Sequence, residues 1–305
     1  MMKKMVHLLL MSSLILILTA CSMEPPEWAK PDEKKDLTDV KIGLSVSTLD
    51  NPFFVSLKNG VLKEAKNKNM QVITVDAQDD TAKQINDVED LIQQGVDILL
   101  INPTDSSAIS SAVQSANHIG IPVITLDRTA DDGEVEAFIA SDNIEGGKMA
   151  ANFIIDKLGK DVKVVELQGT PGASASRERG EGFHSIADQH LNVIARQTAN
   201  FDRTQGLNVM ENLLQGHKEI DAVFAQNDEM ALGAIEAINS SGRDILVVGF
   251  DGNDDAIKAV EEGRLSATIA QQPELIGKEA VIAASKILKG EKVDSKISVP
   301  LKLVE

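Results

Sequence analysis

Short apolar runs alternate with amphipathic segments along most of the chain. The runs are five to eight residues of nearly continuous Val, Ile and Leu, and the segments between them, such as 53–66 and 82–94, carry apolar residues three or four positions apart. Continuous apolar strands separated by helices are typical of a parallel sheet covered on both faces. The sequence therefore predicts an α/β fold with right-handed crossovers. The predicted strands are 40–47, 71–77, 97–102, 122–127, 138–142, 163–169, 192–197, 221–227 and 245–251.

The alternating pattern occurs twice. Residues 86–102 and 208–227 each read as a helix, a Gln-Gly break and a buried strand that ends on Asn. A further helix and a strand ending on Asp follow in both cases, 25 positions after Asn102 and 24 after Asn227. Any α/β chain looks roughly self-similar, but matched polar residues at matched strand ends are harder to explain that way. We therefore expect two similar doubly wound lobes.

These matched polar residues indicate where a ligand would bind. In open parallel sheets, ligands lie outside the carboxyl ends of the strands. Asn102, Asp127, Asn227 and Asp251 all fall at such ends. If the lobes face each other across a cleft, each contributes one carboxylate and one amide to it.

Further side chains around these strand ends favour an uncharged polyol. Phe53 and Phe54 are adjacent, so one helix face cannot bury both, and Arg128 directly follows the strand 122–127. Arg179 and Phe201 follow strands of the second half. Carboxylates accept hydrogen bonds from hydroxyls and guanidinium groups donate to them, while aromatic faces cover the apolar C–H face of a sugar ring.

Charge and composition exclude several other classes. The formal net charge is −17, which disfavours nucleic acid as a partner. A single Cys rules out a disulfide framework or a thiolate metal cluster. The stretch from Asp251 to Glu262 imitates a calcium loop, but Ala256 occupies the position where such loops require Gly. We expect no cofactor, no metal and no catalytic residues.

The first 39 residues predict a leader and a tether. Lys3 and Lys4 precede an apolar stretch at 6–18, which is too short to span a bilayer and ends in Leu-Thr-Ala-Cys, a sequence that resembles the bacterial lipobox. This predicts a signal peptide over 1–20 and a lipid anchor, including palmitate, on Cys21. A plain secretory leader with an incidental Cys is the alternative. Residues 21–39 are rich in Pro and charge, which predicts a linker holding the protein at the extracytoplasmic face of the membrane.

Dense matches over residues 40–305 carry a family resemblance. The strings STLDNPFFVSLK, LLINPTD, IPVITLDR, RERGEGF, FDRTQGLNVM, AVFAQNDEMALGA and VVGFDG resemble the periplasmic sugar-binding proteins of ABC transporters. The resemblance implies a type I fold whose two lobes are joined by three hinge crossings and close on a sugar. It also implies a monomeric, non-enzymatic receptor that delivers sugar to the permease. The implied lobes are 40–141 plus 272–300 and 142–271 plus 301–305.

The resemblance also implies a ligand and a set of contact positions. D-ribose is the implied sugar, and Phe54 and Phe201 would sandwich its ring. Allose, another pentose or a furanosyl signalling molecule remain alternatives, because the fold alone does not fix the ligand. The implied sugar-binding residues are Asn51, Phe53, Phe54, Asn102, Asp127, Arg128, Arg179, Phe201, Asn227, Phe250, Asp251 and Gln271.

Two rival functions compete with that of a receptor. A sugar-responsive transcriptional regulator shares the two-lobed body, but it needs an N-terminal DNA-binding motif where this chain has a leader and a linker. An enzyme acting on a sugar could use Asp127 and Asp251 as paired carboxylates. Flanking arginines are expected to keep both ionised, which removes the general acid that such an enzyme requires.

Overall fold

The computed structural model describes residues 39–305. The predicted signal peptide, the lipidation site at Cys21 and almost all of the predicted linker lie outside the described residues. Within residues 39–305, no helix has the length and apolar character needed to cross a membrane.

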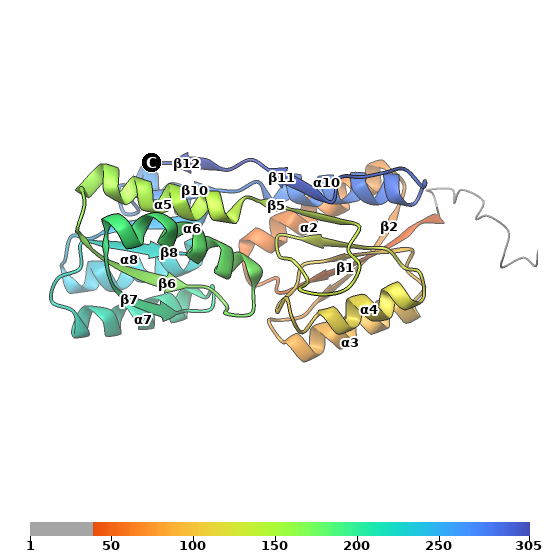
Figure 1. Cartoon of the computed structure of the whole chain (residues 1–305), viewed down its shortest axis with the longest axis horizontal. Helices are drawn as coiled ribbons and strands as arrows, with labels where there is room; N and C mark the ends of the chain where they lie inside the picture. Colours follow the sequence, from red (N-terminus) through yellow and green to blue (C-terminus); the bar gives the residue numbers. More distant parts are fainter. Residues whose placement is uncertain (1–38) are drawn as a thin grey trace, which may run out of the picture. The chain divides into compact units, whose positions relative to one another are not determined.

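The first lobe is a six-stranded parallel sheet with helices on both faces (Figure 1). Its strand order is β11-β5-β4-β3-β1-β2. One face packs on α2 and α10, and the other packs on α3 and α4. The bounds are β1 Lys41–Val46, α2 Pro52–Asn67, β2 Gln71–Asp76, α3 Thr81–Gln93, β3 Ile98–Ile101, α4 Ser110–His118, β4 Val123–Leu126, β5 Ala137–Ser141, α10 Pro273–Ile287 and β11 Lys296–Val299.

The second lobe repeats this arrangement with strand order β12-β10-β9-β8-β6-β7. Helices α5 and α6 cover one face, and α7, α8 and α9 cover the other. The bounds are α5 Asn143–Leu158, β6 Lys163–Gln168, α6 Ser174–His190, β7 Asn192–Thr198, α7 Arg203–Gly216, β8 Ala222–Ala225, α8 Asp228–Ser241, β9 Leu246–Asp251, α9 Asp254–Glu261, β10 Ala267–Ala270 and β12 Lys302–Val304. The two doubly wound lobes expected from the repeated pattern are thus present.

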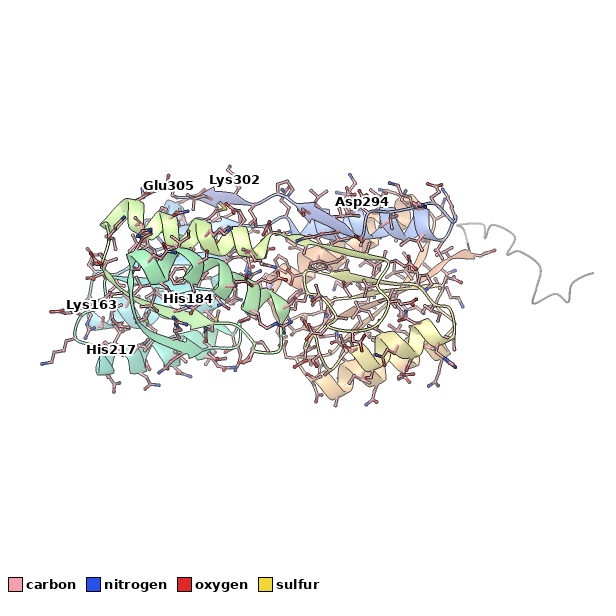
Figure 2. The ribbon with its side chains drawn as sticks, viewed as in Figure 1. Lys163, His184, His217, Asp294, Lys302 and Glu305 are labelled. Atoms are coloured by element: carbon pink, nitrogen blue, oxygen red, sulfur yellow. The ribbon has the colours of Figure 1, made fainter. Side chains whose placement is uncertain are left out.

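The chain passes between the two sheets three times: from β5 into α5, from β10 into α10, and from β11 into β12. The last crossing adds an antiparallel strand to the second sheet, because β12 pairs antiparallel with β10. Only Pro300 and Leu301 separate β11 from β12, so the chain has no room to turn and enters the second sheet against its strand direction. Lys157 and Glu305 form an ion pair at 2.8 Å that ties the chain end to α5; Figure 2 labels Lys302 and Glu305.

Candidate functional site

Two carboxylates occupy matched strained positions at the carboxyl ends of strands. Asp127 directly follows β4 with φ of 63°, and Asp251 ends β9 with φ of 126°. The Asp127 N–H donates to the Ile139 carbonyl (2.9 Å), and the Asp251 carbonyl accepts from the Gln271 N–H (2.8 Å). Such backbone strain costs on the order of 1–3 kcal/mol per residue and is concentrated at functional sites.

Both carboxylates line a pocket between the lobes, which we call the interlobe pocket. It has about 230 Å³ of space that includes open solvent, and nine of the twelve sugar-binding residues predicted from sequence lie on its wall. The tenth wall residue is Ala175, in the first turn of α6, which has no polar atom in its side chain and gave no signal in the sequence. The wall residues are Asn51, Phe53, Phe54, Asp127, Arg128, Ala175, Arg179, Phe201, Asn227 and Asp251.

Polar atoms in this wall are buried without hydrogen-bond partners. Asp127 and Arg128 are 3% and 4% exposed, and neither Asp127 Oδ1 nor Arg128 Nε has a partner among the described residues. The 3.7 Å between Arg128 Nε and Asp127 Oδ2 is too long for a hydrogen bond. A buried polar group left unsatisfied costs about 1–3 kcal/mol. A hydroxyl can both donate to such a carboxylate and accept from such a guanidinium.

The second lobe contributes a matching pair. Arg179 Nη1 lies 3.7 Å from Asp251 Oδ1, and its guanidinium carbon lies 3.8 Å from the centroid of the Phe250 ring. Gln271 Nε2 donates to Asp251 Oδ1 at 2.8 Å. Phe250 lies against Arg179 and Gln271 lies against Asp251, and neither is among the residues that line the pocket. Gln271 Oε1 is buried without a hydrogen-bond partner among the described residues.

Asn102 is likewise not among the residues that line the pocket. Its Oδ1 accepts from the Ser47 N–H and its Nδ2 donates to the Leu126 carbonyl, both at 3.1 Å. Both ends of the amide are thus used to join neighbouring strand ends of the first sheet. Asn227, at the matched place in the second lobe, is on the wall. Its Oδ1 caps α8 through the Met230 N–H, and its Nδ2 donates to the Phe201 carbonyl.

Aromatic rings from both lobes face the pocket. Phe54 comes from α2, and Phe201 comes from the turn between β7 and α7. The guanidinium carbon of Arg128 lies 5.1 Å from the Phe54 centroid and 5.3 Å from the Phe201 centroid. Phe53 meets Phe54 edge-on at 5.2 Å. One arginine thus contacts a ring from each lobe, within the range of cation–π attraction.

Burial changes the expected ionisation of the carboxylates. It raises the pKa of Asp127, which Arg128 and Arg179 oppose. Burial also raises the pKa of Asp251 well above its ordinary value, which Arg179 and the Gln271 hydrogen bond oppose. The sequence-based argument that the arginines keep both groups ionised left out this larger opposing effect. Hydroxyl donors from a ligand would favour the ionised form.

The mouth of the interlobe pocket is mainly acidic. A hollow with about 480 Å³ of space, open solvent included, shares Phe54, Arg128 and Phe201 with the pocket and is lined by four carboxylates together with Arg128 and Arg203. The four carboxylates are Asp50, Asp79, Asp202 and Glu229. This charge repels anionic ligands and accepts neutral ones.

Asp79 is a mouth residue that sequence reasoning missed. Its φ is 58° in the turn after β2, and Phe201 has φ of 61° in the matching turn after β7. Burial raises the pKa of Asp79, and Arg128 and a hydrogen bond from Thr48 oppose the rise. The internal repeat was the signal that could have found it, because Asp80 and Asp202 cap the next helix at matched places.

Direct contacts hold the two lobes together beside the pocket. Arg177 Nη2 of α6 lies 2.8 Å from Asp131 Oδ1 in the first lobe. Ser174 Oγ accepts from the Thr129 N–H at 2.9 Å. The structure is therefore a form in which the lobes are closed on each other.

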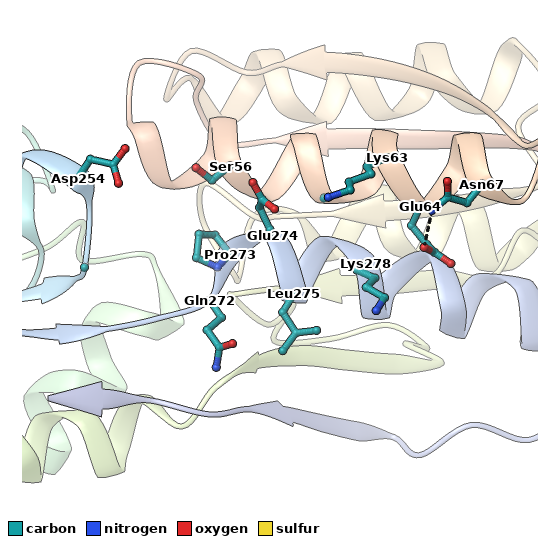
Figure 3. Close-up of a pocket in the computed structure, with 12 residues that line it drawn as sticks. Ser56, Lys63, Glu64, Asn67, Asp254, Gln272, Pro273, Glu274, Leu275 and Lys278 are labelled. Atoms are coloured by element: carbon teal, nitrogen blue, oxygen red, sulfur yellow. Dashed lines mark hydrogen bonds between the residues drawn. The ribbon is translucent and has the colours of Figure 1, made fainter. Parts of the chain in front are cut away.

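A second and larger hollow lies between α2, α10 and the start of α9, with about 1160 Å³ of space that includes open solvent (Figure 3). It contains none of the predicted sugar-binding residues. Lys63, Glu64 and Lys278 line it, and every polar side chain on its wall is exposed or half-buried. Solvated charges of this kind need no ligand, so the interlobe pocket is the better candidate site.

Comparisons with known proteins agree with this geometry. Residues 42–292 match the family model described as periplasmic binding protein domain. The chain is 67% identical over 302 residues, 99% of both chains, to the ribose import binding protein RbsB of Bacillus subtilis. It is 56% identical to the Escherichia coli protein of the same name, over 86% of this chain and 90% of that one.

Solved structures give the same result for the fold. A solute-binding protein of Bacillus halodurans with bound myo-inositol superimposes with a TM-score of 0.83 at 34% identity, covering 90% of this chain and 96% of that chain. One from Actinobacillus succinogenes with bound D-allose gives 0.82 at 31% identity, covering 87% and 97%.

Proposed function

Because the chain belongs to the ribose import binding proteins of the periplasmic binding protein family, we propose that it captures D-ribose between its two lobes and delivers it to the membrane permease of an ABC importer. Members of this family are extracytoplasmic binding proteins and not enzymes. We extend this to the present chain, in which Asp127 and Asp251 would bind hydroxyl groups without proton transfer.

The observation that carries the proposal is the pair of unpartnered buried atoms, Asp127 Oδ1 and Arg128 Nε, on the interlobe pocket wall. An acceptor and a donor side by side fit one sugar hydroxyl. Asp251 and Arg179 place the same two residue types on the wall from the other lobe, with Arg179 Nη1 3.7 Å from Asp251 Oδ1. A ligand that contacts both lobes favours the closed form, because only a differential interaction shifts such an equilibrium.

The choice of ribose rests on the relatives rather than on the fold. Related structures hold D-allose or myo-inositol, and a 33% identical relative is named a D-apiose import binding protein. The 67% identical relative is named for ribose. All of these ligands are neutral polyols, which suit the acidic mouth.

We further propose that the mature chain begins at Cys21, which carries the lipid, and that the protein works as a monomer on the outer face of the membrane. Its lobes would be 40–141 plus 272–300 and 142–271 plus 301–305. Labelling cells with a palmitate analogue tests the anchor. Label on the wild-type chain and none on a Cys21→Ala variant supports it, and equal labelling of both contradicts it.

Titration calorimetry of the purified protein tests the ligand. D-ribose is expected to bind more tightly than D-allose, D-xylose, myo-inositol and D-galactose, with ribose 5-phosphate excluded by the acidic mouth. Tighter binding of another neutral sugar would replace ribose and keep the function class. Binding of none of these sugars would contradict the proposal.

A further inference from the structure

A buried polar network lies behind the second-lobe half of the interlobe pocket. Its centre is Gln226, which follows β8 and is completely buried. Gln226 Oε1 accepts from the Gly169 N–H (2.9 Å) and from Ser176 Oγ (2.7 Å), while its Nε2 donates to Glu166 Oε1 (2.9 Å). Its main-chain carbonyl accepts from Arg179 Nη1 at 2.6 Å.

Three of these four bonds, those to Gly169, Ser176 and Arg179, support parts of the pocket wall. Gly169 lies directly against Phe201, since a Cβ at position 169 would collide with the Phe201 ring. Ser176 is adjacent to Ala175 in the first turn of α6. Arg179 lies next to Asp251. Gln226, through its side chain and its main-chain carbonyl, thus fixes Gly169 behind the Phe201 ring, the first turn of α6 and the Arg179 guanidinium.

Glu166 fixes the orientation of the Gln226 amide. Its carboxylate is completely buried, and its Oε2 accepts from Gln168 Nε2 (3.1 Å) and meets His184 Nε2 (3.0 Å). A carboxylate accepts hydrogen bonds and a backbone N–H only donates them. Gln226 must therefore direct its NH₂ toward Glu166 and its oxygen toward Gly169, and no flipped amide satisfies both.

His184 closes the outer end of the network. It lies on α6 (Figure 2), its side chain is 15% exposed, and its Nδ1 meets Asp188 Oδ1 at 2.8 Å. Arg196 on β7 lies 3.4 Å from the same carboxylate. When His184 is protonated, it places a positive charge beside the buried Glu166 and so reduces the cost of burying that carboxylate.

Every member of the network belongs to the second lobe, so opening of the lobes does not break it. We propose that Gln226, oriented by Glu166, is a positioning residue that preorganises the second-lobe half of the sugar site before the sugar arrives. The inference rests on the proposed function for its affinity readout. Preorganisation raises affinity because less freedom is lost on binding.

Three variants test this by calorimetry with D-ribose: Gln226→Leu, Gln226→Glu, and Gln226→Glu combined with Glu166→Gln. The Gln226→Leu variant removes the three hydrogen bonds of the Gln226 side chain. The Gln226→Glu variant places a second buried carboxylate beside Glu166, so the two repel each other. In the double variant the amide introduced at position 166 donates to the carboxylate introduced at position 226. That carboxylate still accepts hydrogen bonds from the Gly169 N–H and from Ser176 Oγ, so the side chain at position 226 again makes three hydrogen bonds. Both single variants are expected to bind at least about tenfold more weakly, and the double variant within about threefold of wild type.

Ile238→Ala serves as the matched control, because it removes a buried side chain from the far end of α8 without touching the network. It is expected to lower thermal stability and leave ribose affinity unchanged. Wild-type affinity in Gln226→Leu, or in Gln226→Glu, would overturn the inference. So would failure of the double variant to bind more tightly than Gln226→Glu.

Amide hydrogen exchange of the free protein separates this inference from the proposed function. The Gly169 N–H is expected to be protected in wild type and in the double variant, and to exchange at least about tenfold faster in Gln226→Leu. If the wild-type protein binds no ribose, the proposed function is contradicted. The exchange rate of the Gly169 N–H still tests whether the Gln226 hydrogen-bond network exists. An unprotected Gly169 in wild type, or equal protection in Gln226→Leu, would contradict the network itself.

Discussion

The two lobes place the same residue types at the same strand ends but use them differently. Asp127 and Asp251 both lie on the interlobe pocket wall in strained backbone, each with an arginine nearby. Asn102 and Asn227 are not alike: the first joins strand ends of its own sheet, and the second lines the pocket. Both lobes thus place their matched carboxylate on the pocket wall. Packing within each lobe determines whether the matched asparagine also lies there, as Asn227 does and Asn102 does not.

The turns after β2 and β7 show the same divergence. Asp79 and Phe201 share a left-handed backbone, yet one lies only at the acidic mouth and the other also lies on the pocket wall. The first lobe therefore supplies its ring from α2, as Phe54, and the second supplies its ring from this turn. One sugar with an apolar face can then contact a ring from each lobe.

The matched carboxylates are expected to give the largest effects. Asp127→Ala and Asp251→Ala should each weaken ribose binding by about tenfold or more, because a hydrogen bond to a charged group contributes about 1.5–3 kcal/mol. Calorimetry measures both. A large loss at one position with none at the other would break the equivalence of the lobes.

The matched asparagines should differ in affinity. Asn227→Ala should weaken ribose binding by about tenfold and also lower the free energy of unfolding by about 0.5–2 kcal/mol, because it removes the cap of α8 at the Met230 N–H. Asn102→Ala should chiefly lower the free energy of unfolding, by about 1–3 kcal/mol, because it leaves the Ser47 N–H and the Leu126 carbonyl unsatisfied. Urea denaturation and calorimetry on both variants decide this. The reverse assignment would contradict the comparison.

Asp228, a buried carboxyl next to Asn227, makes the stability of the second lobe depend on pH. The matched position of the first lobe holds Pro103, which does not titrate. Burial raises the pKa of Asp228 from 3.8 to about 7, against hydrogen bonds from Thr268 and from the Asn253 N–H. The folded state then binds more protons than the unfolded state between these values, so stability falls as pH rises from about 4 to 7.

Urea denaturation at pH 4.5 and 7.5 measures the loss in the free energy of unfolding between these two pH values. Asp228→Asn is expected to make this loss smaller by at least about 1 kcal/mol. Part of the loss should remain in the variant. The pKa of His184 is also raised, by its hydrogen bonds to Glu166 and Asp188 against the effect of burial, so stability from this group is lost as pH rises through its folded pKa. An unchanged slope in Asp228→Asn would contradict the assignment.

The smallest effect is expected from the contacts between the lobes. Arg177→Ala removes an ion pair with Asp131 that is almost half exposed on both sides. Such pairs contribute about 0.2–1 kcal/mol, so ribose affinity should fall by no more than about fivefold. Asp131→Ala should give the same loss, and the double variant no more than either. Additive losses would show that the two side chains act independently.

Much of the fold could be predicted from the sequence, because buried parallel strands have a distinctive apolar pattern. The nine predicted strands correspond to β1–β9. Strands β10, β11 and β12 were not among them; β11 and β12 each begin with Lys and lack the continuous apolar run of the predicted strands. Their pairing depends on the hinge crossings, which local periodicity does not encode.

The sequence predicted those site residues that lie at the carboxyl ends of strands, because the strand ends themselves could be predicted. Asp127, Asp251 and the residues next to them were placed by the pattern. That Asn102, Phe250 and Gln271 do not line the pocket could not be predicted, because it depends on which neighbour each side chain meets after packing. The role of Gln226 was missed for the same reason, since its partners lie 50 to 60 positions away.

A crystal structure of the protein with D-ribose tests the central claim most directly. One sugar is expected in the interlobe pocket between Phe54 and Phe201, with hydroxyls within hydrogen-bond distance of Asp127 and Arg128 from one lobe and of Asp251 and Arg179 from the other. Ribose bound in the hollow between α2 and α10, or contacting only one of the two carboxylates, would contradict it.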